Sequence, residues 1–156
     1  MPGPIDYSLI NHQPDLDSAG WWEGTAAHRL LVPSCEDCAY RWFPPGPVCP
    51  SCRSMNLGWH EAEGRGVIAG YVVVCHPVLA AFREAVPYVV ALVELPDCAN
   101  ANGEPVRIGG VLVDDEEAAA IGAPVEVVYD HAPDDAFVVP RWRVSGEAAD
   151  GWRFEN

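Results

Sequence analysis

The chain has 156 residues, of which 49% are apolar, so it can build a folded core, and intrinsic disorder is disfavoured. The 23 acidic and 9 basic residues give a net charge of −14, and all nine basic residues are arginines. Because lysine and arginine carry most of the affinity for nucleic acids and anionic membranes, this charge disfavours both as partners. No apolar run reaches the roughly 18 residues of a membrane-spanning helix, and the N-terminus lacks a signal-peptide pattern, so we expect a cytoplasmic protein.

Residues 1–29 are predicted to form a proline-rich extension followed by a helix. Over residues 15–32, apolar side chains recur at the three- or four-residue steps of one helix face: Leu16, Ala19, Trp22 and Ala26. Gly20 and Gly24 weaken this prediction. Trp21 and Trp22 are adjacent and therefore point about 100° apart on a helix. We expect one of them to pack on the neighbouring lobe and the other to be available to a partner.

Four cysteines in two C-x-x-C pairs, with ten residues between the pairs, predict a metal site within residues 30–60. The ligands would be Cys35, Cys38, Cys49 and Cys52. Both thiolates of one C-x-x-C turn reach the same ion, and two such turns complete the tetrahedral cage of a structural Zn²⁺. A rubredoxin-type iron site uses the same four thiolates, and a pair of redox dithiols is a further alternative. A closed cage has no open coordination position, so we interpret this lobe as architecture.

Residues 64–144 have the texture of a β-domain. Runs rich in β-branched and aromatic residues predict five strands, at 66–76, 87–95, 105–113, 124–129 and 137–144. Gly109-Gly110 predicts a bulge in the third strand. Asp114 as an N-cap, with Glu117 completing a capping box, predicts a short helix that ends at Gly122. This element order is typical of an OB-fold barrel, and a Greek-key sandwich of another topology is the alternative.

The predicted fold class is therefore mainly β. An N-terminal helical segment (1–29) precedes a Cys₄ zinc ribbon (30–60), a five-stranded OB-fold barrel with one short helix between strands three and four (64–144), and a C-terminal tail (145–156). Aromatic residues predicted to be exposed at the ribbon tip and in the tail are candidates for docking a partner: Trp42, Phe43, Trp152 and Phe154.

The order of these motifs resembles the OB-fold, acyl-CoA-associated proteins that carry an N-terminal rubredoxin-like zinc ribbon. The matching stretches cover residues 20–144 and are, in order, Trp21-Trp22-Glu23-Gly24, Cys35 to Cys38, Phe43-Pro44-Pro45, Cys49-Pro50-Ser51-Cys52, Trp59, Gly64-Arg65-Gly66, His76-Pro77, 87–95 and 121–125. Two features depart from the family. Ala39 and Arg53 stand where the family usually has glycine after each cysteine pair, and the loop 98–103 is longer.

The resemblance implies a function. Members of this family are non-catalytic partners of thiolase-like acyl-CoA enzymes, including retro-aldolases that shorten steroid side chains, or of MaoC-type enoyl-CoA hydratases. By resemblance, this chain would bind an acyl-CoA thioester, carry structural Zn²⁺, and complete the active site of such a partner in a hetero-oligomer.

Local positive charge is needed if an acidic protein is to hold the phosphates of coenzyme A. The candidates in the β-domain are Arg65, Arg83 and Arg107, with Arg41 and Arg53 in the metal lobe. We favour Arg107, because it interrupts an apolar strand near a barrel mouth. Phe82 and Tyr88 could stack on the adenine. For the arginines, pairing with a nearby acid is the competing interpretation, and for the aromatic residues it is packing in the core.

Catalysis by the chain alone is not expected. The motifs of serine hydrolases, zinc proteases and P-loop proteins are absent from the sequence. Cys75 and His76 are adjacent on a predicted strand, so they face opposite sides and cannot form a dyad. We predict Cys75 to be a buried strand thiol.

Two other classes of function remain open at this point. Zinc ribbons and OB barrels both occur in single-stranded nucleic-acid-binding modules, although the absence of lysine disfavours that class here. Iron in the Cys₄ site would instead make the chain a rubredoxin-like electron carrier.

Overall fold

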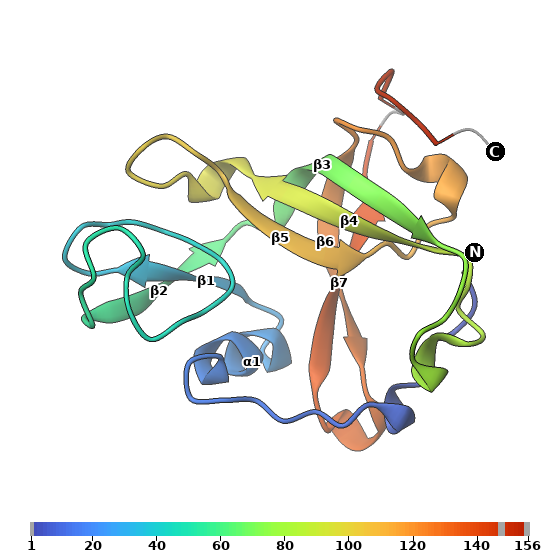
Figure 1. Cartoon of the computed structure of the whole chain (residues 1–156), viewed down its shortest axis with the longest axis horizontal. Helices are drawn as coiled ribbons and strands as arrows, with labels where there is room; N and C mark the ends of the chain where they lie inside the picture. Colours follow the sequence, from blue (N-terminus) through green and yellow to red (C-terminus); the bar gives the residue numbers. More distant parts are fainter. Residues whose placement is uncertain (1, 147–148, 155–156) are drawn as a thin grey trace.

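A computed structural model describes residues 2–146 and 149–154, and it confirms a mainly β protein (Figure 1). Its α-helix and strands are α1 (Ala19–Ala26), β1 (Leu30–Cys35), β2 (Leu57–Ala62), β3 (Arg65–Val74), β4 (Tyr88–Leu95), β5 (Val106–Val111), β6 (Pro124–His131) and β7 (Val138–Val144). Short 3₁₀ helices lie between them: η1 (Tyr7–Leu9), η2 (Ala80–Phe82), η3 (Pro96–Cys98), η4 (Glu116–Ala118) and η5 (Pro133–Asp135).

Strands β3 to β7 form one antiparallel sheet in the order β5-β4-β3-β6-β7. The sheet curls so that its two edges meet: Leu112, just after β5, forms a parallel bridge with Trp142 of β7, and the N–H of Val113 donates to the Trp142 carbonyl at 2.8 Å. Closure of this kind removes exposed strand edges. The result is the nearly closed five-stranded barrel of an OB-fold, as the sequence predicts.

The two glycines Gly109 and Gly110 in β5 do not form the bulge that the sequence predicts, and the barrel core explains why glycine is needed at Gly110. The β4–β5 pairing runs without a register shift through both glycines, so the predicted bulge is wrong. The bulge lies instead in β3, between Ile68 and Gly70. A Cβ on Gly110 would come within 2.8 Å of the Trp142 indole, which is 1% exposed. Gly110 is therefore needed because the indole covers the backbone there, which is one of the recognised uses of glycine in a strand.

Helix α1 packs against the ribbon through its glycines. A Cβ on Gly20 would lie 2.4 Å from the Trp59 ring, and one on Gly24 would lie 2.8 Å from the side chain of Leu31. The buried residues of α1 are Trp21, Gly24 and Thr25, whereas Leu16 lies before the helix and is 95% exposed. The prediction that Leu16, Ala19, Trp22 and Ala26 form the buried face of the helix is therefore wrong. The side of α1 that carries Gly20 and Gly24 faces the ribbon, because only glycine lets the helix backbone approach the ribbon this closely.

The predicted capping box between β5 and β6 does not form. Instead of an α-helix, the structure has the three-residue η4, and its N-cap is Asp115 rather than Asp114. The Asp114 carboxylate accepts the N–H of Val144 at 2.7 Å and so joins the segment to β7. Ala119 and Ala120 are buried in the barrel core and do not continue a helix. Tertiary packing thus overrides the local helix signal.

The described part of the tail lies against the barrel. The carbonyl of Trp152 accepts the N–H of Ile121 at 3.0 Å, and the N–H of Phe154 donates to the Tyr71 hydroxyl at 2.7 Å. The side chains of Trp152 and Phe154 are 63% and 52% exposed. Among the described residues, no helix is long and apolar enough to cross a bilayer, and α1 has only eight residues.

Candidate metal centre and aromatic cavity

The four predicted cysteine ligands lie on two turns with the same hydrogen-bond pattern. In the first turn, the Cys35 carbonyl accepts the N–H of Ala39, and the N–H of Cys35 donates to Tyr40, both at 2.9 Å. In the second, the same two bonds join Cys49 to Arg53 and Ser54, again at 2.9 Å. The duplicated C-x-x-C therefore folds as a duplicated knuckle, and the β1–β2 pair holds the two knuckles side by side.

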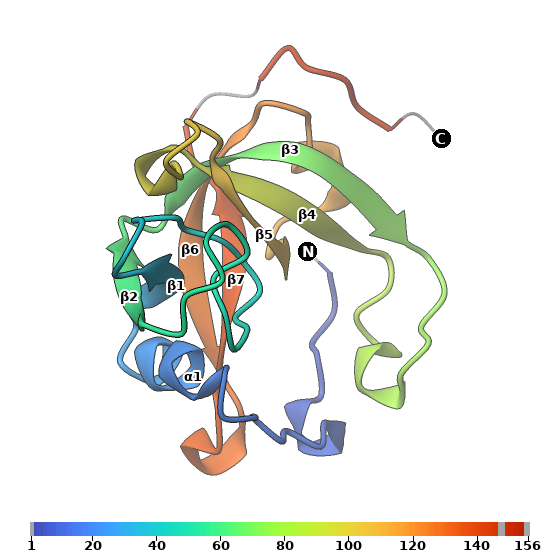
Figure 2. The same cartoon turned by 60° about the vertical axis from the view of Figure 1, so that its left-hand side comes forward.

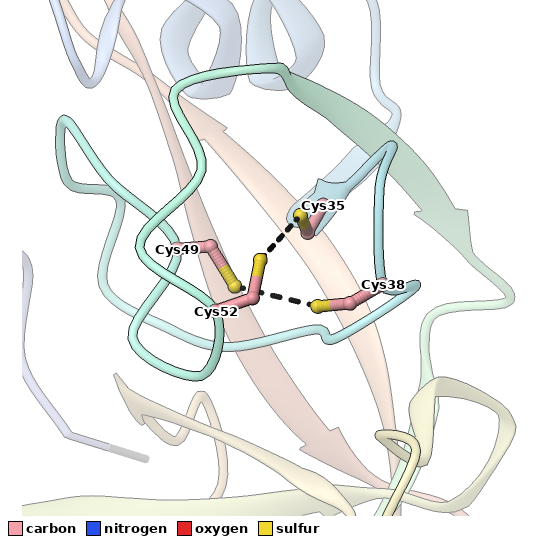
Figure 3. A group of neighbouring side chains, drawn as sticks. All are labelled: Cys35, Cys38, Cys49 and Cys52. Atoms are coloured by element: carbon pink, nitrogen blue, oxygen red, sulfur yellow. Dashed lines mark hydrogen bonds between the residues drawn. The ribbon is translucent and has the colours of Figure 1, made fainter.

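The sulfur atoms converge, as Figure 3 shows. All four lie within 4.8 Å of one another, and the pairs Cys35–Cys52 and Cys38–Cys49 are each 3.6 Å apart. A tetrahedron with Zn–S bonds of about 2.3 Å has sulfur–sulfur edges of about 3.8 Å. The donor set and its dimensions therefore fit a Cys₄ zinc ion, and they do not match two disulfides, whose bonds are about 2.0 Å long.

Hydrogen bonds at this centre shift the pKa values of the cysteine thiols in different directions. Burial raises the pKa of the Cys49 thiol, but hydrogen bonds with the N–H groups of Cys52 and Ser51 and with the Cys38 and Cys52 side chains together lower it to about 7. At Cys38 and Cys52, backbone N–H groups lower the pKa, but burial and neighbouring cysteine side chains raise it by more. Cys35 and Cys49 are buried, and all four ligand positions are filled by protein sulfur. A bound Zn²⁺ would link β1, both knuckles and the start of β2, and would have no open position for a substrate.

Each knuckle ends in a left-handed residue that is not glycine. Ala39 has φ of 59° and Arg53 has φ of 63°, a conformation that costs an L-residue about 1–2 kcal/mol. We predict that Ala39→Gly and Arg53→Gly each stabilise the zinc-loaded protein by about 0.5–1 kcal/mol, after allowance for glycine's greater entropy loss on folding. Thermal unfolding and competition with a zinc chelator measure the gain. Arg83→Gly is the control, because Arg83 has φ of −57° and should gain nothing.

A second feature is an apolar cavity of about 470 Å³ where the N-terminal segment closes one side of the barrel. Figure 2 shows this segment, in blue, running past η1 to α1. The cavity is walled largely by aromatic side chains from distant parts of the chain: Tyr7, His12, Trp21, Trp22, Phe43, Phe82 and Phe137. Trp21 packs on Phe43 with ring centres 4.8 Å apart, and His12 lies between Trp22 and Phe137.

Arg141 supplies the charge at this cavity. Its guanidinium donates to the Asp130 carboxylate and to the Leu112 carbonyl, both at 2.8 Å, and its side chain is only 12% exposed. The Tyr7 hydroxyl donates to the same Asp130 at 2.9 Å. Burial, followed by the Asp130 charge, raises the Tyr7 pKa above its usual value, so Tyr7 stays neutral. Arg141 Nε and His12 Nε2 are buried without a hydrogen-bond partner among the described residues.

The predicted coenzyme A residues do not form one cluster. Arg107 donates through two nitrogens to Glu94 on β4, at 2.9 and 2.7 Å, and lines a groove of about 310 Å³ with Arg41 and Phe43. Phe82 lines the aromatic cavity and packs on Tyr88. Arg65 is exposed on β3, and Arg83 is exposed at the end of η2.

Two further expectations change, and three cavity residues were not expected at all. Cys75 is exposed beyond the end of β3, so its prediction as a buried strand thiol was wrong, because the strand ends one residue earlier. The ribbon-tip aromatics are half-buried, since Phe43 turns back onto Trp21 and Trp42 packs on Tyr40. Sequence reasoning also missed His12, Phe137 and Arg141 as cavity residues. No local motif marks them, because only the closed barrel brings them together.

A Cys₄ ribbon on an OB barrel defines a class of zinc-ribbon OB-fold proteins. The family described as the ChsH2 rubredoxin-like zinc ribbon domain matches residues 22–58, and the ChsH2 C-terminal OB-fold domain matches residues 59–130. The DUF35 domain-containing scaffold protein of Methanocaldococcus jannaschii is 33% identical over 117 residues, which are 74% of this chain and 77% of that protein. The chain belongs to this DUF35 family of ChsH2-type zinc-ribbon and OB-fold proteins.

Solved structures agree. The chain matches a chain of the Ltp2-ChsH2(DUF35) aldolase with a TM-score of 0.73 and 33% identity, covering 86% of this chain and 98% of that one. A DUF35-family protein of unknown function from Sulfolobus solfataricus shares the fold, with a TM-score of 0.55 and 14% identity over 90% of this chain and 93% of that one.

Hydratase subunits are also similar. The 3-oxo-4,17-pregnadiene-20-carboxyl-CoA hydratase alpha subunit of Mycobacterium tuberculosis is 33% identical over 86% of this chain, and the probable enoyl-CoA hydratase alpha subunit of Thermomonospora curvata is 43% identical over 52%. This chain spans only 40% and 25% of the length of those two subunits.

Proposed function

We propose that this chain is a non-catalytic accessory subunit that binds an acyl-CoA thioester and completes the active site of a thiolase-like partner, such as a retro-aldolase. The observation that carries this proposal is the match to the DUF35 chain of the Ltp2-ChsH2 aldolase, which covers 98% of that chain. A resident zinc ion without an open position is consistent with a scaffolding role.

Two adjoining hollows support acyl-CoA as the ligand. The aromatic cavity suits an apolar acyl group, and the neighbouring groove carries Arg41 and Arg107 for phosphate groups. Phe43 lines both, so the two hollows meet at this side chain. In this arrangement, phosphate would compete with Glu94 for Arg107, whose side chain is 57% exposed and therefore pairs only weakly with Glu94.

A MaoC-type enoyl-CoA hydratase is the second candidate partner. The observation that favours it is the similarity to two hydratase alpha subunits. Both candidates act on coenzyme A thioesters, so they predict the same ligand class and different reactions. A nucleic-acid role has less support, given the net charge of −14.

Co-purification from the native host, followed by mass spectrometry, tests the proposal. We expect a stoichiometric thiolase-like or MaoC-like enzyme, whose turnover of acyl-CoA rises when this chain is added, and no turnover by this chain alone. Robust turnover by the purified chain would contradict a non-catalytic role, and co-purification with nucleic acid would contradict the whole proposal.

Arg107→Ala in the reconstituted complex tests the ligand site. Losing one charge-assisted contact to a phosphate should raise KM for the acyl-CoA roughly tenfold and leave kcat nearly unchanged. Arg143→Ala is a matched control, since Arg143 is also an exposed strand arginine beside a glutamate, Glu126. If the two substitutions changed KM equally, Arg107 would not be a residue of the acyl-CoA site.

A further inference from the structure

A second group of metal-ligating side chains lies where the ribbon meets the barrel, outside the Cys₄ centre. His60 on β2, together with Asp97 and Cys98 in η3, places an imidazole nitrogen, a carboxylate oxygen and a sulfur all within 4.8 Å of one another. The turn between β4 and β5 that contains η3 lies beside the end of β2 in both views (Figures 1 and 2). The group thus draws ligands from two lobes that β3 and β4 separate in the sequence.

The structure already orients these three side chains. One oxygen of Asp97 accepts the N–H of Glu63 at 2.7 Å, which orients the carboxylate, and the Asp97 carboxylate also hydrogen-bonds with the Cys98 thiol. The Cys98 side chain is 0% exposed. The His60 ring is half-buried and makes no hydrogen bond to any residue that the structure describes. The oriented carboxylate, the imidazole without a hydrogen-bond partner and the buried sulfur together form a set of three donors that can bind one metal ion.

A Cys-His-Asp nucleophile would use the same residue types, but the burial of Cys98 opposes that role. No substrate carbon reaches a sulfur that is fully covered. Burial, followed by the charge of Asp97, raises the pKa of the Cys98 thiol to about 12, so the free group is a thiol rather than a reactive thiolate. His60 and Asp97 are half-exposed, which leaves an approach for a small ion from their side.

We propose that His60, Asp97 and Cys98 bind a second divalent metal ion of the zinc class. A mixed nitrogen, oxygen and sulfur donor set suits Zn²⁺, which accepts all three at about 2.0–2.3 Å in a tetrahedron with solvent at the fourth position. Such a tetrahedron has ligand–ligand edges of about 3.3–3.7 Å, so ligand atoms that now lie within 4.8 Å of one another close by about 1.5 Å at most. On binding, the sulfur–hydrogen bond of Cys98 breaks, a sulfur–metal bond forms, and the proton leaves to solvent.

The local charges favour a cation. Asp97, the metal-bound thiolate and the nearby Glu63 are negative, and they sit in a chain whose net charge is −14. Arg41 is the positive group that faces Cys98, and its guanidinium contacts the Ala99 carbonyl at 3.5 Å. Before binding, Asp97 and Glu63 outweigh this single arginine, and Cys98 adds a third negative charge once its proton has left. Once bound, the ion would join β2 to η3 and so hold the ribbon against the barrel.

The test is zinc titration of the full chain with its Cys₄ centre already loaded, read as metal equivalents per chain and as the thermal midpoint. Wild type should bind two equivalents, and the second should raise the midpoint. We expect each of three variants, His60→Ala, Asp97→Asn and Cys98→Ala, to bind one zinc equivalent. Loss of a residue that only hydrogen-bonds a ligand lowers metal affinity roughly 10–100-fold, and loss of a ligand itself lowers it further. His76→Ala and Cys75→Ala, in the exposed loop after β3, should still bind two.

Two results would overturn this proposal. One is a single equivalent in wild type with about 10 μM free zinc, and the other is a second equivalent that survives in His60→Ala. The latter would indicate scattered binding to surface carboxylates. Since His60 lies on a half-exposed strand face, its alanine variant should fold even if Cys98→Ala does not. Neither readout involves acyl-CoA, so failure of this site leaves the accessory-subunit proposal unaffected.

Discussion

Cys35→Ser or Cys52→Ser should unfold the ribbon and lower the solubility of the chain. A zinc ion bound to the four converging thiolates would hold the two knuckles together, and zinc binding by such lobes contributes about 10–16 kcal/mol that becomes folding free energy. The small β1–β2 sheet cannot replace that contribution, since isolated two-stranded sheets are marginal in water. Loss of the Cys₄ ion by elemental analysis, together with loss of dispersed amide resonances for residues 30–62, measures the effect.

Cys75→Ser is the control for this experiment, because Cys75 is exposed and lies outside the ribbon. It should keep the ion and the dispersed resonances. A Cys35→Ser protein that stayed folded and lost only the turnover of its partner complex would refute the structural assignment of the zinc. The native protein should also lack the visible absorbance of a rubredoxin-type iron centre, in agreement with its zinc-ribbon family.

Trp142→Ala should cost about 3–5 kcal/mol, the usual range for truncating a buried aromatic side chain. The indole is 1% exposed and fills the barrel where β5 and β7 meet over Gly110. For a domain of this size, the loss corresponds to a fall in the thermal midpoint of roughly 10 °C. Chemical denaturation measures the free energy directly.

Trp152→Ala is the matched control, because that tail tryptophan is 63% exposed and its ring centre lies 5.8 Å from that of Tyr71. Its truncation should cost less than about 1 kcal/mol. If the two substitutions cost the same, Trp142 would not be the residue that fills the closing seam of the barrel.

Much of the architecture is local in the sequence. Runs such as Tyr71-Val72-Val73-Val74 predict strands because β-branched and aromatic side chains suit a pleated, half-buried surface. The Cys₄ centre is predictable because each C-x-x-C turn is formed by adjacent residues whose spacing fixes the geometry. Five strands in this order were therefore enough to indicate the barrel.

The rest depends on contacts between distant segments. Contacts with Trp59 and Leu31 determine which side of α1 is buried. Asp114, which the sequence predicts to cap a helix, instead accepts a hydrogen bond from the N–H of Val144. The aromatic cavity could not be predicted, because its wall exists only after the N-terminal segment crosses the closed barrel. The same holds for His60 and Cys98, which no sequence spacing relates.

Through Phe43, the metal lobe also affects the shape of the aromatic cavity. Phe43 sits in the chain between Cys38 and Cys49, and its ring forms part of the wall of the apolar hollow against Trp21. The shape of the aromatic cavity thus depends on the folded state of the two knuckles, which a bound zinc ion would stabilise. In a cell short of zinc, newly made copies would therefore lack this part of the cavity wall, so the shape of the cavity would depend on the supply of metal.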